Sequence, residues 1–190
     1  MNREDVTKLL EETGAIMRGH FLLTSGLHSP TYVEKFRLLE HPEYTERLCK
    51  ELAESFANDD VQLTVGPMTG GILLAHEVGK ALKTKAIFTE RENGKMTLRR
   101  DFEIPQGARV LVVEDIVTTG GSVKEVLDVV VEKGGVPVGV GILVNRSGGR
   151  ANFGVKTVSL LQLEIPTYKP EDCPLCKNGE PFTKRGRTGK

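Results

Sequence analysis

Along the middle of the chain, short apolar runs alternate with segments in which apolar residues recur at helical spacing. The runs stay apolar through both phases of strand alternation, which is typical of strands covered on both faces. Strands that alternate with helices along a chain form a mostly parallel sheet flanked by helices. The sequence therefore predicts an α/β fold. The apolar runs lie at residues 61–65, 86–89, 110–113 and 136–144, and the helical segments at residues 71–82 and 121–131.

The length of the chain and its charge balance limit the number of domains and the kinds of partner. The 190 residues suffice for one domain with its own core. The 26 basic and 26 acidic side chains cancel, which argues against a nucleic-acid partner. The charged N-terminus lacks the apolar segment of a secretory signal, and no apolar stretch approaches the ~18 residues of a membrane span. We therefore expect a cytoplasmic protein that binds neither nucleic acid nor membrane.

The first 60 residues are predicted to contain two helices and, between them, two strands. Apolar residues recur at helical spacing over residues 3–13. Residues 20–23 and 31–36 have the composition of two strands around a loop with a Ser-Gly turn. Pro42 is a favourable first helical residue, so the second helix is expected to begin there.

The loop after the third apolar run carries the clearest chemical signal. Glu114 and Asp115 follow a buried strand, and the hydroxyl-rich and glycine-rich stretch 118–122 then opens a helix. Glycines let backbone amides approach a ligand, and a helix N-terminus favours anions, so this stretch predicts a phosphate cradle. Two carboxylates would repel that phosphate unless they faced sugar hydroxyls or a cation on the same ligand. The loop therefore predicts binding of a ribose phosphate.

This segment resembles the 5-phosphoribosyl diphosphate (PRPP) motif of type I phosphoribosyltransferases, in its apolar strand, two acids, two spacer residues and T-T-G-G-S turn. The resemblance implies the fold of that family and a single domain over residues 1–190. Within it we expect an N-terminal hood at 1–40, a PRPP-binding core at 61–150 and an irregular tail at 166–190. The acids would hold the ribose and the turn its 5-phosphate. The PRPP-binding residues implied are Glu114, Asp115, Ile116, Val117, Thr118, Thr119, Gly120, Gly121 and Ser122.

A second glycine-rich loop, residues 66–71, again leads from an apolar strand into a helix. In type I phosphoribosyltransferases the corresponding loop contacts the diphosphate. Alone, such a turn is more often only a tight connection between a strand and a helix. Together with the first motif, it favours a second phosphate site.

A charged hairpin is predicted at residues 89–100. Asn93 and Gly94 are the strongest short hairpin signal, and a two-residue turn places Glu92 opposite Lys95. Spacing alone fits an ordinary solvated hairpin equally well. The family resemblance instead implies a mobile arm whose Arg91 and Lys95 bind PRPP and act in catalysis, closing over the diphosphate of a neighbouring subunit in a homodimer.

The resemblance is closest to the orotate phosphoribosyltransferase family. Residues 19–30 are similar to its early hairpin, F-x-L-x-S-G-x-x-S-P, and Arg146 ends a strand where the family places an arginine that grips the pyrimidine. A fixed bidentate donor suits the carboxylate of orotate, and Thr118 is expected to add a hydrogen bond. The resemblance implies transfer of the phosphoribosyl group from PRPP to orotate in pyrimidine biosynthesis, with Mg²⁺ carried by PRPP.

Four departures from the family pattern leave the base specificity open. Each replaces a lysine or histidine common in the family with a side chain that carries no positive charge. We expect Lys35, Arg99 and Arg100 to replace part of this charge. Two alternatives remain: a phosphoribosyltransferase for another nucleobase, and a PRPP-binding regulator without catalysis. The four departures are Thr24, Gly70, Glu92 and Thr97.

Cys173 and Cys176 form a single C-x-x-C motif near the C-terminus. Zinc normally takes four ligands, so a site here would need a second pair from a symmetry-related chain; otherwise the thiols are free or weakly redox active. No metal-ligand spacing is visible among the histidines at positions 20, 28, 41 and 76. We therefore expect no metal site. A solvated tail is expected to contain the basic residues Lys184, Arg185 and Arg187.

Overall fold

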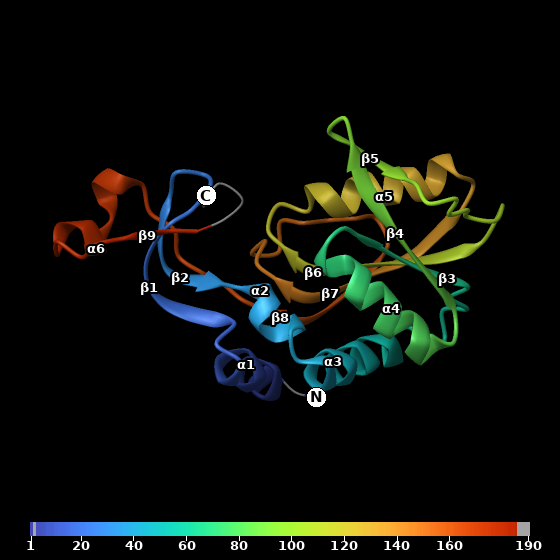
Figure 1. The fold of residues 1–190 in the computed structure, drawn as a ribbon, viewed down its shortest axis with the longest axis horizontal. Coiled ribbons are helices and arrows are strands. Elements are labelled where there is room, and N and C mark those ends of the chain that lie inside the picture. Colours follow the sequence, from blue (N-terminus) through green and yellow to red (C-terminus); the bar gives the residue numbers. More distant parts are fainter. Residues whose placement is uncertain (2, 186–190) are drawn as a thin grey trace.

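Two sheets organise the computed structural model, which describes residue 1 and residues 3–185 (Figure 1). The larger sheet has six strands in the order β5-β4-β3-β6-β7-β8. Every neighbouring pair in it is parallel except β4 with β5. The predicted α/β fold with a mostly parallel sheet is confirmed. The strands are β3 (Leu63–Pro67), β4 (Lys85–Glu92), β5 (Lys95–Leu98), β6 (Arg109–Val117), β7 (Val136–Asn145) and β8 (Lys156–Gln162).

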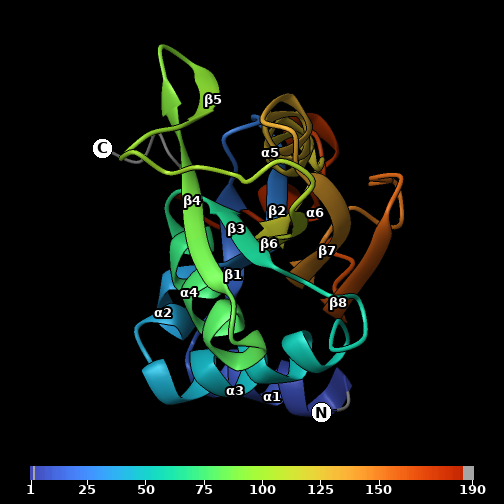
Figure 2. The same ribbon diagram turned by 90° about the vertical axis from the view of Figure 1, so that its right-hand side faces the viewer.

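Helices cover both faces of this sheet (Figure 2). β6 supplies alternate side chains to two cores: Leu111 and Val113 pack with one group of helices, and Val110 and Val112 with the single helix on the other face. This two-sided burial explains why its sequence is apolar in both phases. None of the described helices is long and apolar enough to cross a membrane. The first group is α1 (Arg3–Glu12), α3 (Pro42–Glu54) and α4 (Gly70–Leu82), and the single helix is α5 (Gly121–Glu132).

Two glycines in β7 are explained by the close approach of the chain around α3. A Cβ at Gly139 would lie 2.5 Å from Cε1 of Phe56, and one at Gly141 would lie 3.0 Å from Cδ2 of Leu52. Phe56 and Leu52 are both fully buried. Any larger residue would push these side chains out of the core, which is costly because interiors are close-packed. The interrupted apolar run is therefore an unbroken central strand.

The N-terminal region forms the second sheet. α1 begins and ends close to the predicted bounds, and α3 begins at Pro42 as expected. Between them, β1 (Ile16–Leu22) pairs antiparallel with β2 (His28–Val33). The predicted strand 31–36 is wrong beyond Val33, because the Glu34 side chain accepts a hydrogen bond from the Phe36 N–H and caps the short helix α2 (Lys35–Leu39). We call α1, β1 and β2 the hood.

The C-terminal segment, residues 166–185, lies against the hood (Figure 1). Its residues there contact residues that come some 150 positions earlier in the sequence. The tail, expected to be irregular over residues 166–190, contains three short elements in its described part. β9 (Thr183–Lys184) adds a parallel edge to β1, beside a 3₁₀ turn at Pro170–Asp172 and the helix α6 (Pro174–Lys177). Backbone pairing with β1 supplies hydrogen-bond partners that no local pattern in the tail reveals. The predicted tail residue Arg187 lies outside the described residues.

Candidate active site

The loops that follow β3, β6 and β7 meet at one edge of the sheet. Parallel pairing aligns Val65 of β3 with Val112 of β6, and Val117 of β6 with Asn145 of β7. The N–H of Arg146 donates a 2.7 Å hydrogen bond to the Val117 carbonyl, which holds the two strand ends together. Because parallel strands present their carboxyl ends at the same edge, the predicted site residues after β6 and β7 converge there.

Glu114 and Asp115 lie near the end of β6 and are almost completely buried, with 8% and 2% of their surface exposed. Lys35 of α2 places its Nζ 2.7 Å from Oδ2 of Asp115. The N–H of Ile116 donates to Oδ1 of the same carboxylate at 2.6 Å. Asp115 is therefore held as an anion by a cation and a backbone donor, which offsets the cost of its burial.

The neighbouring carboxyl has a different environment. Burial, and then the negative charge of Asp115, raise the pKa of Glu114 from 4.5 to about 8. Two adjacent buried carboxyl groups resist simultaneous ionisation, so the proton stays on the one without a cation. At neutral pH Glu114 is the proton-bearing member of the pair, able to donate as well as accept hydrogen bonds.

The glycine-rich loop after β3 packs against this acidic pair. A Cβ at Gly70 would collide with Oδ2 of Asp115, and one at Gly66 would collide with the Gly71 carbonyl oxygen. Only glycine fits at these two places. The departure at Gly70, where the family often has a lysine, is thus coupled to the position of the Asp115 side chain.

The loop after β6 forms a small cavity at the N-terminus of α5, lined by residues 116–123. Gly120 has φ +84°, and no side chain among the described residues caps the start of α5, so its first N–H groups lack a side-chain acceptor there. Among the described residues, no hydrogen bond engages the hydroxyls of Thr118, Thr119 or Ser122, which lie in exposed residues. We call residues 118–122 the cradle; donors and dipole together suit a phosphate.

A larger cavity of about 640 Å³, which we call the cleft, lies between the hood and the sheet edge. Asp115 and Lys35 line it, and so does Arg146. Burial lowers the pKa of Arg146, and its Nε is buried without a hydrogen-bond partner in the described structure. A half-buried guanidinium with a buried donor that no described residue engages is prepared for an anionic ligand.

Sequence patterns missed two basic residues of this cleft. Lys184 and Arg185 were expected in a solvated tail, yet β9 carries them to the cleft wall. Nε of Arg185, like that of Arg146, is buried and lacks a partner among the described residues. No local signal marks them, since their position depends on pairing with β1, where the Arg185 N–H donates to the Leu22 carbonyl at 3.1 Å.

The hairpin of β4 and β5, which we call the arm, projects beyond the sheet (Figure 2). Glu92 lies opposite Lys95, and Asn93 and Gly94 both have positive φ, so the predicted two-residue turn is confirmed. Arg91 donates to Glu125 of α5 at 2.8 Å and to the Gly94 carbonyl at 2.7 Å. Lys95 is exposed, and neither it nor Arg91 lines the cleft.

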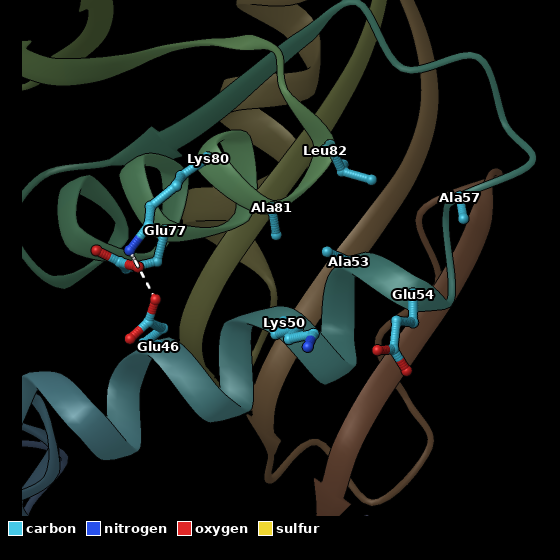
Figure 3. Close-up of a pocket in the computed structure, with 9 residues that line it drawn as sticks. All are labelled: Glu46, Lys50, Ala53, Glu54, Ala57, Glu77, Lys80, Ala81 and Leu82. Atoms are coloured by element: carbon cyan, nitrogen blue, oxygen red, sulfur yellow. Dashed lines mark hydrogen bonds and ion pairs between the residues drawn. The ribbon is translucent and has the colours of Figure 1, made fainter.

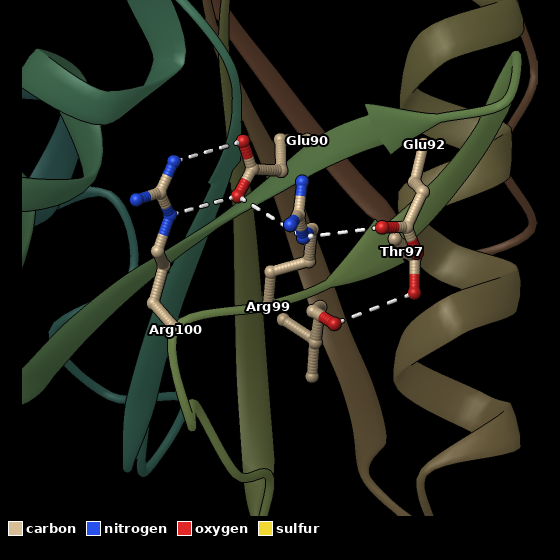
Figure 4. Close-up of polar contacts among 6 residues, drawn as sticks. Glu90, Glu92, Thr97, Arg99 and Arg100 are labelled. Atoms are coloured by element: carbon tan, nitrogen blue, oxygen red, sulfur yellow. Dashed lines mark hydrogen bonds and ion pairs between the residues drawn. The ribbon is translucent and has the colours of Figure 1, made fainter.

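The base of the arm holds a cluster of paired charges (Figure 4). Arg100 places Nε 2.9 Å from the Glu90 carboxylate, and Arg99 lies 3.4 Å from that of Glu92. The ion pair with Arg100 lowers the pKa of Glu90. Arg99 and Arg100 therefore form ion pairs within the arm, whereas Lys35 lines the cleft. Of the three expected replacements for lost positive charge, the structure brings only Lys35 to the site.

A further cavity lies between α3 and α4 (Figure 3). Its charged groups satisfy one another, with Lys80 Nζ at 2.7 Å from Glu46 and 3.3 Å from Glu77. It lies against the helices and contains none of the predicted site residues. Ligands of open α/β sheets bind at the carboxyl ends of the strands, so the cleft and the cradle form the stronger candidate.

An acidic pair, an amide cradle and a cationic cleft at the ends of parallel strands define a phosphoribosyltransferase. A family model described as "Phosphoribosyl transferase domain" matches residues 37–166. The chain is 53% identical to an orotate phosphoribosyltransferase of Desulforamulus reducens, over 98% of this chain and 97% of that protein. It is 51% identical to one of Thermotoga maritima, over 97% of this chain and 98% of that protein. The chain belongs to the orotate phosphoribosyltransferase family.

A solved structure agrees with this assignment. The crystal structure of orotate phosphoribosyltransferase from Aeropyrum pernix matches with a TM-score of 0.72 at 30% identity. The match covers 83% of this chain and 93% of that one. The expected type I phosphoribosyltransferase fold is confirmed.

The raised pKa of Glu114 makes folding stability depend on pH. Its carboxyl holds a proton in the folded state between about pH 4.5 and pH 8, where the unfolded chain has released it. Stability is therefore fully present below this window and falls as the pH rises through it. We expect the wild type to lose at least ~1.4 kcal/mol, the equivalent of one pKa unit, more than Glu114→Gln across this window. Urea unfolding at a series of pH values measures both.

Glu132→Gln provides the control, because that carboxylate is 64% exposed. Its pH dependence should follow that of the wild type. Parallel curves for the wild type and Glu114→Gln would show that the folded protein does not hold this proton.

Proposed function

We propose that this protein transfers the 5-phosphoribosyl group from PRPP to orotate, giving orotidine 5-phosphate and diphosphate in pyrimidine biosynthesis. The observation that carries the proposal is the Nε of Arg146, which is buried and has no hydrogen-bond partner among the described residues, in a cleft shared with Asp115. An anionic base fits this cation, and a ribose fits the acids beside it. The names of the relatives support the same substrate.

The sugar phosphate would bind across β6 and its loop. Ribose hydroxyls would donate to the ionised Asp115 and exchange hydrogen bonds with Glu114, which holds its proton in the free protein. The 5-phosphate would occupy the cradle, where no side chain of the described residues bonds the hydroxyls of Thr118, Thr119 and Ser122 or caps the first N–H groups of α5. Ile116 and Val117 space the acids from the cradle, and Ile116 fixes the Asp115 carboxylate.

Orotate would bind in the cleft beside the ribose. Its carboxylate would pair with the Arg146 guanidinium, whose backbone is fixed on β6 by the bond to Val117. Thr118 would add a hydrogen bond from the adjoining loop. Because Arg146 is already partly desolvated, pairing with an anion brings a reduced desolvation cost and a strong charge-assisted bond.

The reaction is a displacement at the anomeric carbon, with oxocarbenium-like character in the transition state. The cleft and the cradle would hold the base nitrogen and the sugar in line, which lowers the barrier by orientation. Lys95 and Arg91 would neutralise charge on the departing diphosphate, an interaction that strengthens as the bond breaks. Arg91 must exchange its contact with Glu125 for the ligand, so the arm has to move.

The site also fits Mg²⁺ carried by PRPP. Asp115 offers carboxylate oxygens and the protonated Glu114 its carbonyl oxygen, and hard oxygen donors are those that Mg²⁺ prefers. When bound, the ion neutralises charge on the diphosphate. The protein would contribute through these two acids, with Lys35 balancing the charge of Asp115.

The arm supports a homodimer. Lys95 is exposed near the tip of a hairpin that projects beyond the sheet (Figure 2), and it does not line the cleft of its own chain. Paired charges at its base, among them Glu90 and Arg100, keep the hairpin formed while its tip reaches outward. A second copy related by a two-fold axis would receive the tip over its cleft.

The proposed compartment is the cytoplasm. In the described structure none of the three cysteines, Cys49, Cys173 and Cys176, forms a disulfide. Free thiols persist in reducing compartments, whereas oxidising ones favour disulfides.

An absorbance assay tests the reaction directly. Addition of PRPP and Mg²⁺ to the protein should consume orotate, and an excess of hypoxanthine, adenine or uracil should not slow it. Turnover of one of these bases in place of orotate would identify another nucleobase as substrate. PRPP binding without turnover of any base would indicate a regulator, and either result contradicts the proposal.

Arg146→Ala should selectively weaken the binding of orotate. Loss of a charge-assisted hydrogen bond costs about 1.5–3 kcal/mol, so KM for orotate should rise at least ~10-fold while KM for PRPP changes less than ~2-fold. Arg150→Ala, which alters an exposed arginine four residues away, should leave both values unchanged. Equal increases for both substrates in Arg146→Ala would show that this residue only maintains the fold of the cleft.

Mixed dimers test whether the arm acts in the partner's site. Lys95→Ala and Asp115→Ala should each lower kcat by at least ~10²-fold. Co-expressed at equal levels, half of the dimers are mixed, and one of their two sites has both native residues, so activity should recover to about a quarter of wild type. If each arm served its own chain, no site would be intact and no activity would return.

A further inference from the structure

Four potential metal ligands from distant parts of the chain converge at the edge of the hood. They are His20 of β1, His28 of β2, Cys173, and Cys176 of α6, and their ligand atoms all lie within 4.8 Å of one another. Sγ of Cys176 lies 3.2 Å from Nδ1 of His28, and Sγ of Cys173 lies 3.5 Å from Nε2 of His20. Two thiols and two imidazoles are the ligand set of a structural zinc ion.

The spacing fits a tetrahedral ion. With Zn–S near 2.3 Å and Zn–N near 2.0–2.1 Å, the edges of a tetrahedron measure about 3.3–3.8 Å. The sulfur-to-nitrogen distances of 3.2, 3.5 and 3.7 Å lie close to this range. Nε2 of His20 and Nδ1 of His28 are 2.7 Å apart, so an ion at the centre requires them to separate by roughly 0.6 Å.

The ring of His20 is oriented as a metal ligand would be. Its Nδ1 lies 2.7 Å from the Glu180 carbonyl oxygen. A carbonyl only accepts, so Nδ1 carries the proton and the lone pair of Nε2 points into the cluster. A ligating histidine usually donates its other N–H to such an acceptor, which fixes the ring and its tautomer.

The surroundings suit an ion whose charge is cancelled by its ligands. His20, His28 and Cys173 are buried, with 5%, 3% and 0% of their surfaces exposed. The Phe182 ring packs at 5.6 Å from that of His20 and 5.1 Å from that of His28, measured between centroids. Two thiolates neutralise a divalent cation, so this group can be buried without a net charge.

We propose that His20, His28, Cys173 and Cys176 bind a structural Zn²⁺ that clamps the C-terminal segment to the hood. Beyond Leu161, Cys173 is the only buried residue in the part of the chain that the structure describes, so this segment has almost no core of its own. Small units without a core are commonly held by a metal or a disulfide. The two strands of the hood supply the second ligand pair, so no symmetry-related chain is needed.

The clamp acts near the cleft. Cys176 is followed by the Glu180 carbonyl that orients His20 and then by β9, which carries Lys184 and Arg185 to the cleft wall. A metal that fixes this segment on β1 also fixes the two basic residues. The zinc site takes no part in the reaction proposed above, and its occupancy is measured without substrate.

Metal analysis tests the site. Full-length protein, expressed with added zinc and purified without a metal-affinity tag, should contain about one zinc per chain by elemental mass spectrometry. Cys176→Ser and His28→Ala should lose most of it. Cys49→Ala and His76→Ala, which alter a thiol and an imidazole outside the cluster, should retain it. Zinc far below one per chain in the wild type, or equal loss in the controls, would overturn the proposal.

Two measurements on the wild type avoid dependence on folding of the variants. Protein refilled with Co²⁺ should show the visible bands of a tetrahedral site with thiolate ligands, and their absence would count against it. Without reductant, the intact mass should show both thiols free of a mutual disulfide. A mass lower by two hydrogens would instead identify Cys173 and Cys176 as a redox pair.

Proteolysis tests the clamp itself. Removal of zinc by a chelator should raise the rate of tryptic cleavage after Lys177 at least ~10-fold, because local opening exposes the segment. The same chelator should not change cleavage of Cys176→Ser, which is already open. An unchanged rate in the wild type after proven zinc loss would show that the metal does not hold the segment.

Discussion

Parallel pairing of β6 with β3 and β7 is the constraint from which the rest of the site follows. It brings the glycine loop, the acidic pair, the cradle and Arg146 to one edge of the sheet, although they are spread over some 80 residues. The bond from the Arg146 N–H to Val117 extends this register beyond the strands. Since both faces of β6 are buried, a shift of register would disturb both cores, so packing holds the site in place.

Charged side chains line the cleft before a ligand binds. Asp115 is balanced by Lys35, whereas Arg146 and Arg185 keep buried donors without partners in the described structure. Such donors are costly in an empty protein and become favourable when an anion arrives. The packing of the two cores stabilises the fold enough to offset this free-energy cost. A bound substrate with several negative charges would remove the cost by pairing with these donors.

The arm, the hood and the C-terminal segment are stabilised in different ways. The charged side chains of the arm form local ion pairs around Glu90, and Lys95 is exposed near its tip. The C-terminal segment has little core of its own, because beyond Leu161 the one buried residue in the described part of the chain is Cys173. Backbone pairing of β1 with β9 and a four-ligand metal site replace the hydrophobic core that such a small unit lacks.

The sequence by itself determined the central sheet, the arm turn and the acidic loop with its cradle, because each depends on neighbours a few residues apart. Apolar runs predict strands buried on both faces, and Asn93-Gly94 predicts the hairpin. Only the tertiary structure decided that Arg185 lines the cleft and that His20 meets Cys173, 153 residues away. The periodicity of apolar residues does not predict such long-range contacts, because the tertiary fold of the whole chain determines which distant side chains come into contact.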